Sequence, residues 1–189
     1  MRPSPLLAVV AALGCAAHRA SLRQGPAGER RAIVRAARSL LGAREITLRG
    51  RRLPSDCWAL PVAAYGRSGL ALGGGNAEGL YADARAAGRL REAGRPRPGD
   101  LLFLRIPPQA PVAGAPVVHV GIVGEVALDG TLLVYQRMAH GVVAYHLNPG
   151  HPKEPFAPEG RAWNDPIATG PGVRRPAGEL YAGYASLVE

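Results

Sequence analysis

The chain has 189 residues, of which 47% are hydrophobic and 20% charged. This is enough apolar material for one domain with its own core, and because no apolar run reaches about 18 residues, a polytopic membrane protein is excluded. Two cysteines exclude a disulfide-stapled mini-domain and a four-cysteine zinc site. The formal net charge is +9, but the arginines occur singly or in pairs without interleaved aromatic residues, so no nucleic-acid partner is expected.

The first twenty residues have the layout of a secretory signal. Arg2 precedes a nine-residue apolar stretch, residues 6–14, which is too short to span a bilayer. Residues 12–15 (ALGC) resemble a bacterial lipobox with its first two positions exchanged. We therefore predict a signal peptide over residues 1–20 with cleavage before Cys15, lipidation at Cys15, and export to the bacterial cell envelope. Ordinary cleavage after Ala17 or Ala20 is the alternative.

A tether and three helices are predicted next. Residues 21–29 have the composition of a tether. Residues 26–41 carry apolar side chains on one stripe and arginines on the other, which predicts an amphipathic helix. A second helix is predicted over residues 55–68, with Ser55 or Asp56 as its cap, and a third over residues 76–93.

The pattern then changes to that of an antiparallel meander. A strong hairpin turn, Asp129-Gly130, lies between two short apolar runs. The predicted strands cover residues 100–105, 117–123, 131–137 and 142–147. Helices followed by antiparallel strands predict an α+β fold. Residues 151–189 are predicted to be a Pro/Gly-rich C-terminal extension that packs on the domain and ends in a short helix over residues 179–187.

Three residues can carry chemistry on this scaffold. Cys57 is predicted in the first turn of a helix, where amide hydrogens favour the thiolate. His119 interrupts an apolar strand, and Gln136 lies late in the next one. A cysteine nucleophile, an imidazole base and a polar group that orients the imidazole are the parts of a thiol hydrolase. This role requires His119 and Gln136 to emerge on the sheet face that meets the helix. Taken singly, each residue is also compatible with a structural role.

Four motifs resemble those of the NlpC-type cell-wall cysteine peptidases, which are related to the CHAP amidases. They are residues 56–60 (DCWAL), 97–103 (RPGDLLF), 119–123 (HVGIV) and 134–136 (VYQ). They follow the family's order and indicate such a domain over residues 30–150. The resemblance implies a papain-like fold, with the helices packed on the meander. It also implies cleavage of amide bonds in peptidoglycan stem peptides, often between D-glutamate and diaminopimelate.

The chain departs from the family's pattern at several positions. Trp58 and Ala59 replace the Ser-Gly pair that follows the nucleophile, and Pro61 is unusual in that helix. Residues 46–50 (ITLRG) lack the tyrosine that assists the oxyanion site. The Cys57 amide is then the expected donor, and the loss of one donor typically costs about 10²–10³ in rate.

The sequence therefore predicts an exported, lipid-anchored and monomeric cysteine hydrolase that acts on peptidoglycan peptides. Cys57 would be its nucleophile, His119 its base and Gln136 the group that orients the imidazole. No cofactor is expected. No metal is expected either, because the histidines at 140, 146 and 151 do not form a ligand cluster on one element. The alternatives are an inactive envelope module of the same fold, which binds wall fragments or a partner, and a thiol acyltransferase.

Overall fold

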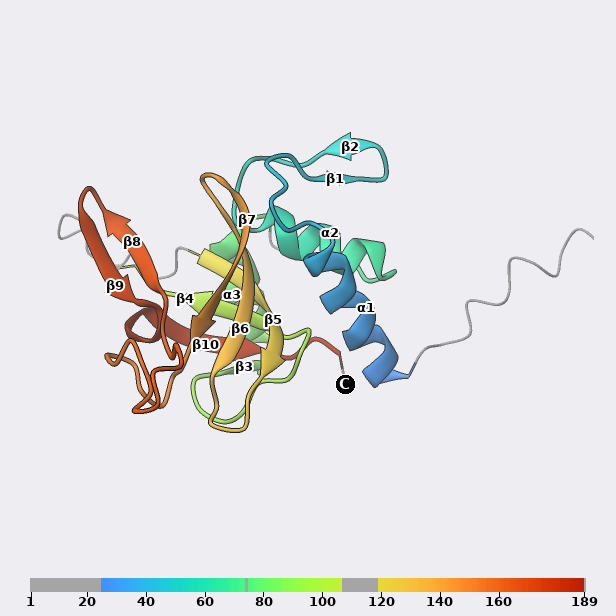
Figure 1. Ribbon diagram of the computed structural model, residues 1–189. Coiled ribbons are helices and arrows are strands. Elements are labelled where there is room, and N and C mark those ends of the chain that lie inside the picture. Colours follow the sequence, from blue (N-terminus) through green and yellow to red (C-terminus); the bar gives the residue numbers. More distant parts are fainter. Residues whose placement is uncertain (1–24, 74, 107–118, 189) are drawn as a thin grey trace, which may run out of the picture.

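A six-stranded antiparallel sheet lies at the centre of the structure, and three helices pack against one of its faces (Figure 1). The structure is a computed structural model and describes residues 25–73, 75–106 and 119–188. Within these ranges the mixed architecture confirms the predicted α+β class. The predicted signal peptide, the lipobox and Cys15 lie outside the described residues.

The helices of the described chain are α1 (Pro26–Arg38), α2 (Ala59–Arg67) and α3 (Ala77–Ala86). The start of α1 is as predicted. The expected cap of α2 was wrong, because its N-cap is Trp58 and no side chain caps it. Asn76 caps α3 by accepting a hydrogen bond from the Gly79 amide at 2.7 Å. This helix ends early because Gly88 adopts a φ of +65° and the chain then turns into a strand.

The sheet has the strand order β3-β10-β4-β5-β6-β7. Its strands are β3 (Leu90–Arg91), β4 (Leu101–Leu104), β5 (His119–Val126), β6 (Leu132–Met138), β7 (Gly141–Leu147) and β10 (Tyr181–Ala185). The meander from β4 to β7 agrees with the predicted strands, and residues 117 and 118 lie outside the described ranges. The predicted Asp129-Gly130 turn is confirmed: Gly130 has a φ of +87°, and Asp129 accepts a hydrogen bond from the Thr131 amide at 3.1 Å.

The C-terminal segment completes the central sheet, which the sequence did not predict. The helix expected over residues 179–187 was wrong, because this segment forms a short 3-10 turn, η1 (Ala177–Leu180), and then β10 between β3 and β4. Gly183 has a φ of +124°, and a Cβ there would lie 2.8 Å from the Arg91 carbonyl oxygen. The close approach of β3 therefore requires glycine at this position.

Two small hairpins project from this body (Figure 1). The first pairs β1 (Thr47–Leu48) with β2 (Arg51–Arg52), and the second pairs β8 (Pro166–Gly170) with β9 (Val173–Pro176). The β1–β2 hairpin lies against the end of α2, where the Arg67 guanidinium donates to the Thr47 carbonyl at 3.1 Å. No helix in the described parts of the chain is long and apolar enough to cross a membrane.

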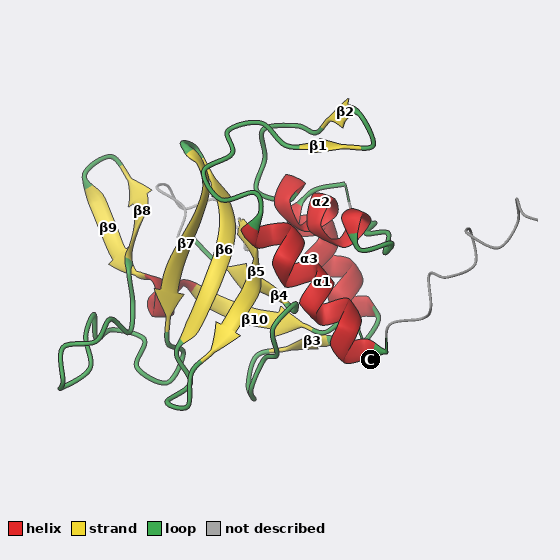
Figure 2. Ribbon diagram, turned by 45° about the vertical axis from the view of Figure 1, so that its right-hand side comes forward, coloured by secondary structure: helices red, strands yellow, loops and turns green. Residues whose placement is uncertain are grey.

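Both faces of the sheet are buried, in two separate hydrophobic clusters. Figure 2 shows the three helices together on one side of the sheet. The helix-facing cluster includes Phe103, Val120, Ile122 and Tyr135 together with the apolar sides of the helices. The opposite cluster includes Leu102, Leu104, Val134, Tyr145 and Leu180. Because side chains alternate along a strand, these clusters assign each remaining strand residue to a face.

A buried ion pair joins the first helix to the entry of β4. Arg30 contacts Asp100 at 2.5 Å, and their side chains are only 9% and 1% exposed. Asp100 also accepts hydrogen bonds from the Arg97 amide at 2.8 Å and the Ser186 hydroxyl at 2.9 Å. Arg30 in turn donates to Ser186 and to the Val188 carbonyl. The pair thus ties α1, the turn before β4 and the segment after β10 together.

We expect Asp100→Ala to lower the free energy of unfolding by roughly 3–5 kcal/mol, because it leaves the Arg30 guanidinium buried without its counter-charge. Urea denaturation monitored by circular dichroism measures this change. The matched control is Glu45→Ala, which removes the exposed partner of Arg52 at 2.9 Å and should cost less than about 1 kcal/mol. Equal losses in the two variants would contradict the importance of the buried pair.

Candidate functional site

Cys57 lies in the turn that leads into α2. It is 5% exposed and precedes the N-cap Trp58, so it does not occupy the first helical turn as expected. The turn is closed by a hydrogen bond from the Ala59 amide to the Asp56 carbonyl at 3.2 Å. The Asp56 carboxylate accepts a hydrogen bond from the Cys57 amide at 2.5 Å. The backbone donor expected for an oxyanion site is therefore engaged by Asp56.

The fold brings this cysteine to the beginning of β5. The backbone N–H of Val120 donates a hydrogen bond to the Cys57 sulfur and lowers the thiol pKa. Val120 directly follows His119, so the thiol contacts the backbone of the residue next to the predicted base. The electrostatic surroundings agree, since the carboxylates of Asp56 and Glu78 act on both Cys57 and His119.

His119 and Gln136 share one face of the sheet. Ile122 pairs with Tyr135 across β5 and β6, so Gly121 lies opposite Gln136. His119 is two residues from Gly121 along β5 and therefore lies on the same face. In agreement, a Cβ on Gly121 would lie 3.5 Å from the Gln136 Cβ. This places His119 diagonally from Gln136, within reach of a long side chain.

That shared face is opposite to the one predicted. Val120, Ile122 and Tyr135 point toward the helices, so alternation directs His119 and Gln136 toward the cluster around Tyr145. The thiol thus meets β5 through the backbone at the start of the strand, and not across the helix-facing surface. The structure places the Cys57 thiol against the backbone at this end of β5, and it places the His119 and Gln136 side chains together on the other face of the sheet.

Two buried polar atoms in this pair have no hydrogen-bond partner among the described residues, His119 Nδ1 and Gln136 Nε2. Gln136 is fully buried, and its Oε1 accepts a hydrogen bond from the Tyr145 hydroxyl at 2.6 Å. An unsatisfied buried polar group costs about 1–3 kcal/mol. Packing alone does not explain why two such atoms lie on adjacent strands, so this pair of side chains is a candidate for a functional role.

The electrostatics of the site keep the cysteine protonated. Burial raises the pKa of the Cys57 thiol to about 12, helped by Asp56 and Glu78, and the Val120 amide only partly opposes this. Burial lowers the pKa of His119, while the same two carboxylates oppose that shift. At neutral pH the site therefore holds a neutral thiol and a neutral imidazole. The expected lowering of the thiol pKa was wrong, because Cys57 is buried outside the helical turn.

Sequence analysis missed two contributors to this site, Glu78 and Tyr145. Glu78 lies in the first turn of α3, and only tertiary packing brings it close to Cys57. Tyr145 is two residues beyond the residue paired with Gln136 in β7, so a correct register would have identified it. In the described ranges no group of three or more His, Cys, Asp or Glu side chains is placed to hold a metal ion.

Comparisons of the chain with protein-family models, with curated proteins and with solved structures find no match. The geometry of the site is therefore the basis for its chemistry.

We expect Asp56→Asn to lower the Cys57 thiol pKa while leaving it above the ordinary value of about 8.5. The substitution removes the negative charge that opposes the thiolate, but burial, the largest cause of the raised pKa, persists. The rate of iodoacetamide alkylation against pH measures this midpoint. Asp83→Asn, which removes an exposed carboxylate of α3, is the control and should not move it. A wild-type midpoint at or below 8.5 would contradict the buried thiol.

Proposed function

We propose that this protein is an exported cysteine hydrolase that cleaves amide bonds in peptidoglycan stem peptides. Cys57 is the nucleophile, His119 the general base and acid, and Gln136 a positioning residue. The observation that supports the proposal is the hydrogen bond from the Val120 amide to the Cys57 sulfur, which brings the thiol to the backbone of the residue after His119, although 62 positions separate Cys57 and His119 in the sequence. Strand alternation directs the His119 side chain toward the opposite face, so the proposal requires its imidazole to reach the thiol around the start of β5. The peptidoglycan substrate rests on the motif resemblance.

The neutral pair sets the order of proton transfers. As the Cys57 sulfur attacks the amide carbonyl carbon, its proton passes to the His119 imidazole. The C–N bond then breaks, and the imidazolium gives this proton to the leaving amine. Water then attacks the thioester carbonyl carbon while His119 takes its proton, the C–S bond breaks, and the imidazolium returns the proton to the Cys57 sulfur as the acid product leaves. Atoms and charges balance without a cofactor.

The carboxylates of Asp56 and Glu78 have opposite effects on the two partners. In the resting state they disfavour a Cys57 thiolate. Once the proton has moved, they stabilise the positive imidazolium, since both raise the pKa of His119. The site is thus arranged for proton transfer that accompanies attack, and not for a preformed thiolate.

Gln136 fits the role of a positioning residue through its contact with Tyr145. An imidazole that presents a lone pair to the thiol carries hydrogen on its other nitrogen, which needs an acceptor. A tyrosine hydroxyl both donates and accepts, so it can hold the Gln136 amide with Nε2 toward Tyr145 and Oε1 toward His119 Nδ1–H. In this orientation both unsatisfied buried atoms acquire partners.

Digestion of purified peptidoglycan, followed by mass spectrometry of the released fragments, tests the function. We expect Cys57→Ala and His119→Ala each to abolish release, and the double variant to be no worse, because the two groups act as one unit. His146→Ala, which alters an exposed histidine paired with Asp165, is the control and should retain full activity. Release of fragments by Cys57→Ala would contradict the proposal.

Gln136→Ala should reduce kcat roughly 10- to 100-fold with little change in KM, because the variant loses ring orientation and not substrate contacts. Gln136→Glu supplies an acceptor for the imidazole N–H and should recover part of the rate. A purely structural role predicts instead that both variants lose activity in proportion to their loss of stability, as measured in a thermal melt.

The pH dependence of kcat/KM should show an acid limb below about pH 6.5, the ordinary histidine value. His119 must be neutral to act as a base, and burial lowers its pKa, so activity is retained until the pH falls through this lowered value. Removing the charge of Glu78 (Glu78→Gln) lowers the His119 pKa further and should move the limb to lower pH. A limb above pH 7 would contradict a buried neutral imidazole.

A catalytically inactive module of the same fold is the second candidate. It is favoured by the Asp56 carboxylate on the Cys57 amide at 2.5 Å, which occupies the expected oxyanion donor. Such a module would bind wall fragments without releasing products, and Cys57→Ala would bind them as the wild type does. The digestion assay and a pull-down on insoluble peptidoglycan separate the two candidates.

A further inference from the structure

The positive charge of the protein is concentrated in one part of the chain. Residues 25–73 contain nine arginines and three acidic residues, residues 75–106 contain six and four, and residues 119–188 contain five basic and six acidic residues. The first segment forms α1, the β1–β2 hairpin and α2. The excess positive charge therefore belongs to one group of adjoining elements and is not spread over the surface.

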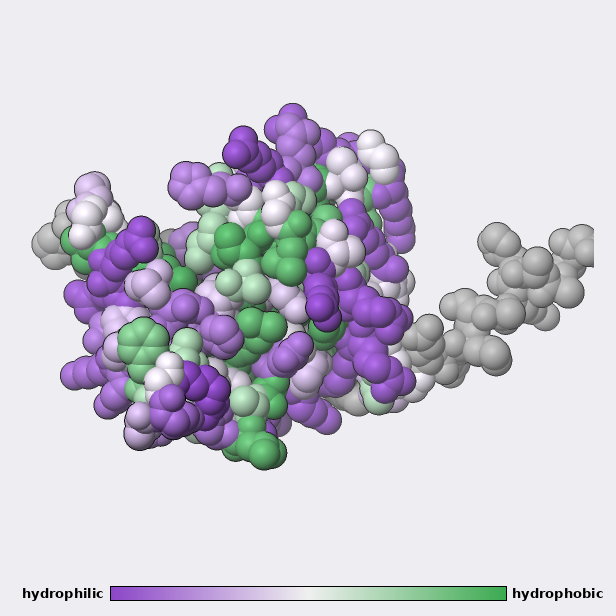
Figure 3. All heavy atoms as spheres, in the orientation of Figure 1, coloured by the Kyte–Doolittle hydropathy of each residue, from purple (hydrophilic) through white to green (hydrophobic). Residues whose placement is uncertain are grey.

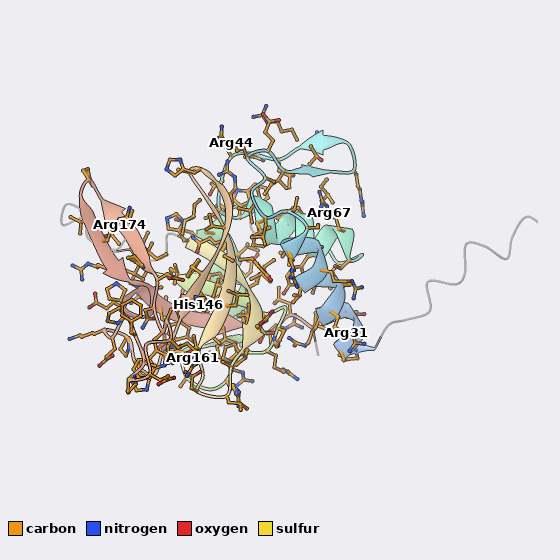
Figure 4. The ribbon with its side chains drawn as sticks, in the orientation of Figure 1. Arg31, Arg44, Arg67, His146, Arg161 and Arg174 are labelled. Atoms are coloured by element: carbon orange, nitrogen blue, oxygen red, sulfur yellow. The ribbon has the colours of Figure 1, made fainter. Side chains whose placement is uncertain are left out.

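These elements display their arginines on a common side of the molecule. The exposed arginines of residues 25–73, apart from the ion-paired Arg52, are called the arginine face; they are Arg31, Arg35, Arg38, Arg44, Arg49, Arg51 and Arg67. The first three follow one another at helical spacing on α1. Figure 4 shows Arg31 and Arg67 on the side of α1 and α2, with Arg174 far away on the β8–β9 hairpin. Hydrophilic side chains cover this side in the space-filling view (Figure 3).

The arginine face is not neutralised by the protein itself. Of the exposed arginines in this part of the described chain, Arg52 has a carboxylate partner, Glu45 at 2.9 Å. No ion pair joins Arg31, Arg35 or Arg38 to any other described residue. A broad set of unpaired guanidinium groups fits an extended anionic surface, because each group gains a counter-charge only from outside.

We propose that the arginine face binds the anionic headgroups of a lipid bilayer. The sequence before α1 supports this occupant, since Cys15, the predicted lipidation site, lies eleven positions upstream of Pro26. Eleven extended residues span at most about 40 Å, so an acyl anchor at Cys15 would keep the arginine face close to the bilayer. One acyl chain is marginal by itself, and a basic surface supplies a second signal for stable attachment.

In this orientation the bilayer does not lie over the turn that carries Cys57. Cys57 precedes the beginning of α2, and Arg67 ends it. The nine residues of α2 separate the two ends by roughly 13 Å. A bilayer held by the C-terminal end of α2 and by the exposed side of α1 therefore does not cover the turn that carries Cys57. The lipid contact does not depend on whether the site is catalytic.

Co-sedimentation with vesicles tests the proposal. The full chain carrying Cys15→Ala, which has no acyl group, is mixed with vesicles of phosphatidylcholine alone or with 30 mol% phosphatidylglycerol. We expect the anionic vesicles to bind it more tightly, and 0.5 M NaCl to remove the difference. Arg31→Gln/Arg35→Gln/Arg38→Gln should weaken binding to anionic vesicles roughly 100-fold, at about fivefold per arginine, without changing binding to neutral vesicles.

The matched control is Arg105→Gln/Arg174→Gln/Arg175→Gln, which removes the same charge from exposed positions after β4 and in β9, outside the arginine face. It should retain most of the anionic binding, and circular dichroism should show that both triple variants are folded. Equal losses in the two variants, or no preference for anionic vesicles, would overturn the proposal. Tighter binding to soluble polyphosphate than to vesicles at equal phosphate concentration would also overturn it, because it assigns the face to a soluble polyanion.

Discussion

The buried contact between Arg30 and Asp100 holds the helical and sheet parts of this protein in register. Burial of two charges costs several kcal/mol per ion, and this cost is offset only when hydrogen bonds satisfy their remaining atoms. Here the Arg97 amide and the Ser186 hydroxyl do so for the carboxylate. In the same turn, the Gly99 carbonyl accepts a hydrogen bond from the Tyr65 hydroxyl of α2 at 2.6 Å. Both α1 and α2 are thereby fixed to β4, the neighbour of the strand that carries His119.

This arrangement explains how a cysteine in a helix-preceding turn meets a distant strand. The position of α2 determines where the Cys57 thiol lies, and the pairing of β4 with β5 determines where His119 lies. The electrostatic consequence is a neutral pair, since burial disfavours both the thiolate and the imidazolium. The two nearby carboxylates tilt the balance toward the imidazolium, which is the form a base reaches only after it has taken the proton. The chemistry proposed for the site follows from this asymmetry.

The molecule also separates two kinds of surface along one short helix. The beginning of α2 lies next to the buried thiol, and its C-terminal end packs against the arginine-rich β1–β2 hairpin. The arginines at one end of this helix are exposed, whereas the cysteine at the other end is buried.

The sequence by itself determined the local elements of this protein. Apolar periodicity located α1 and the four strands of the meander, and the Asp-Gly pair located a turn, because these signals depend on neighbours in the chain. It also singled out Cys57, His119 and Gln136. Tertiary structure alone decided the rest. Residues 181–185 became a central strand because β3 and β4 offered two free edges, and the thiol pKa rose because burial depends on residues distant in sequence. Local propensity cannot encode either effect, since both arise from groups that folding brings together.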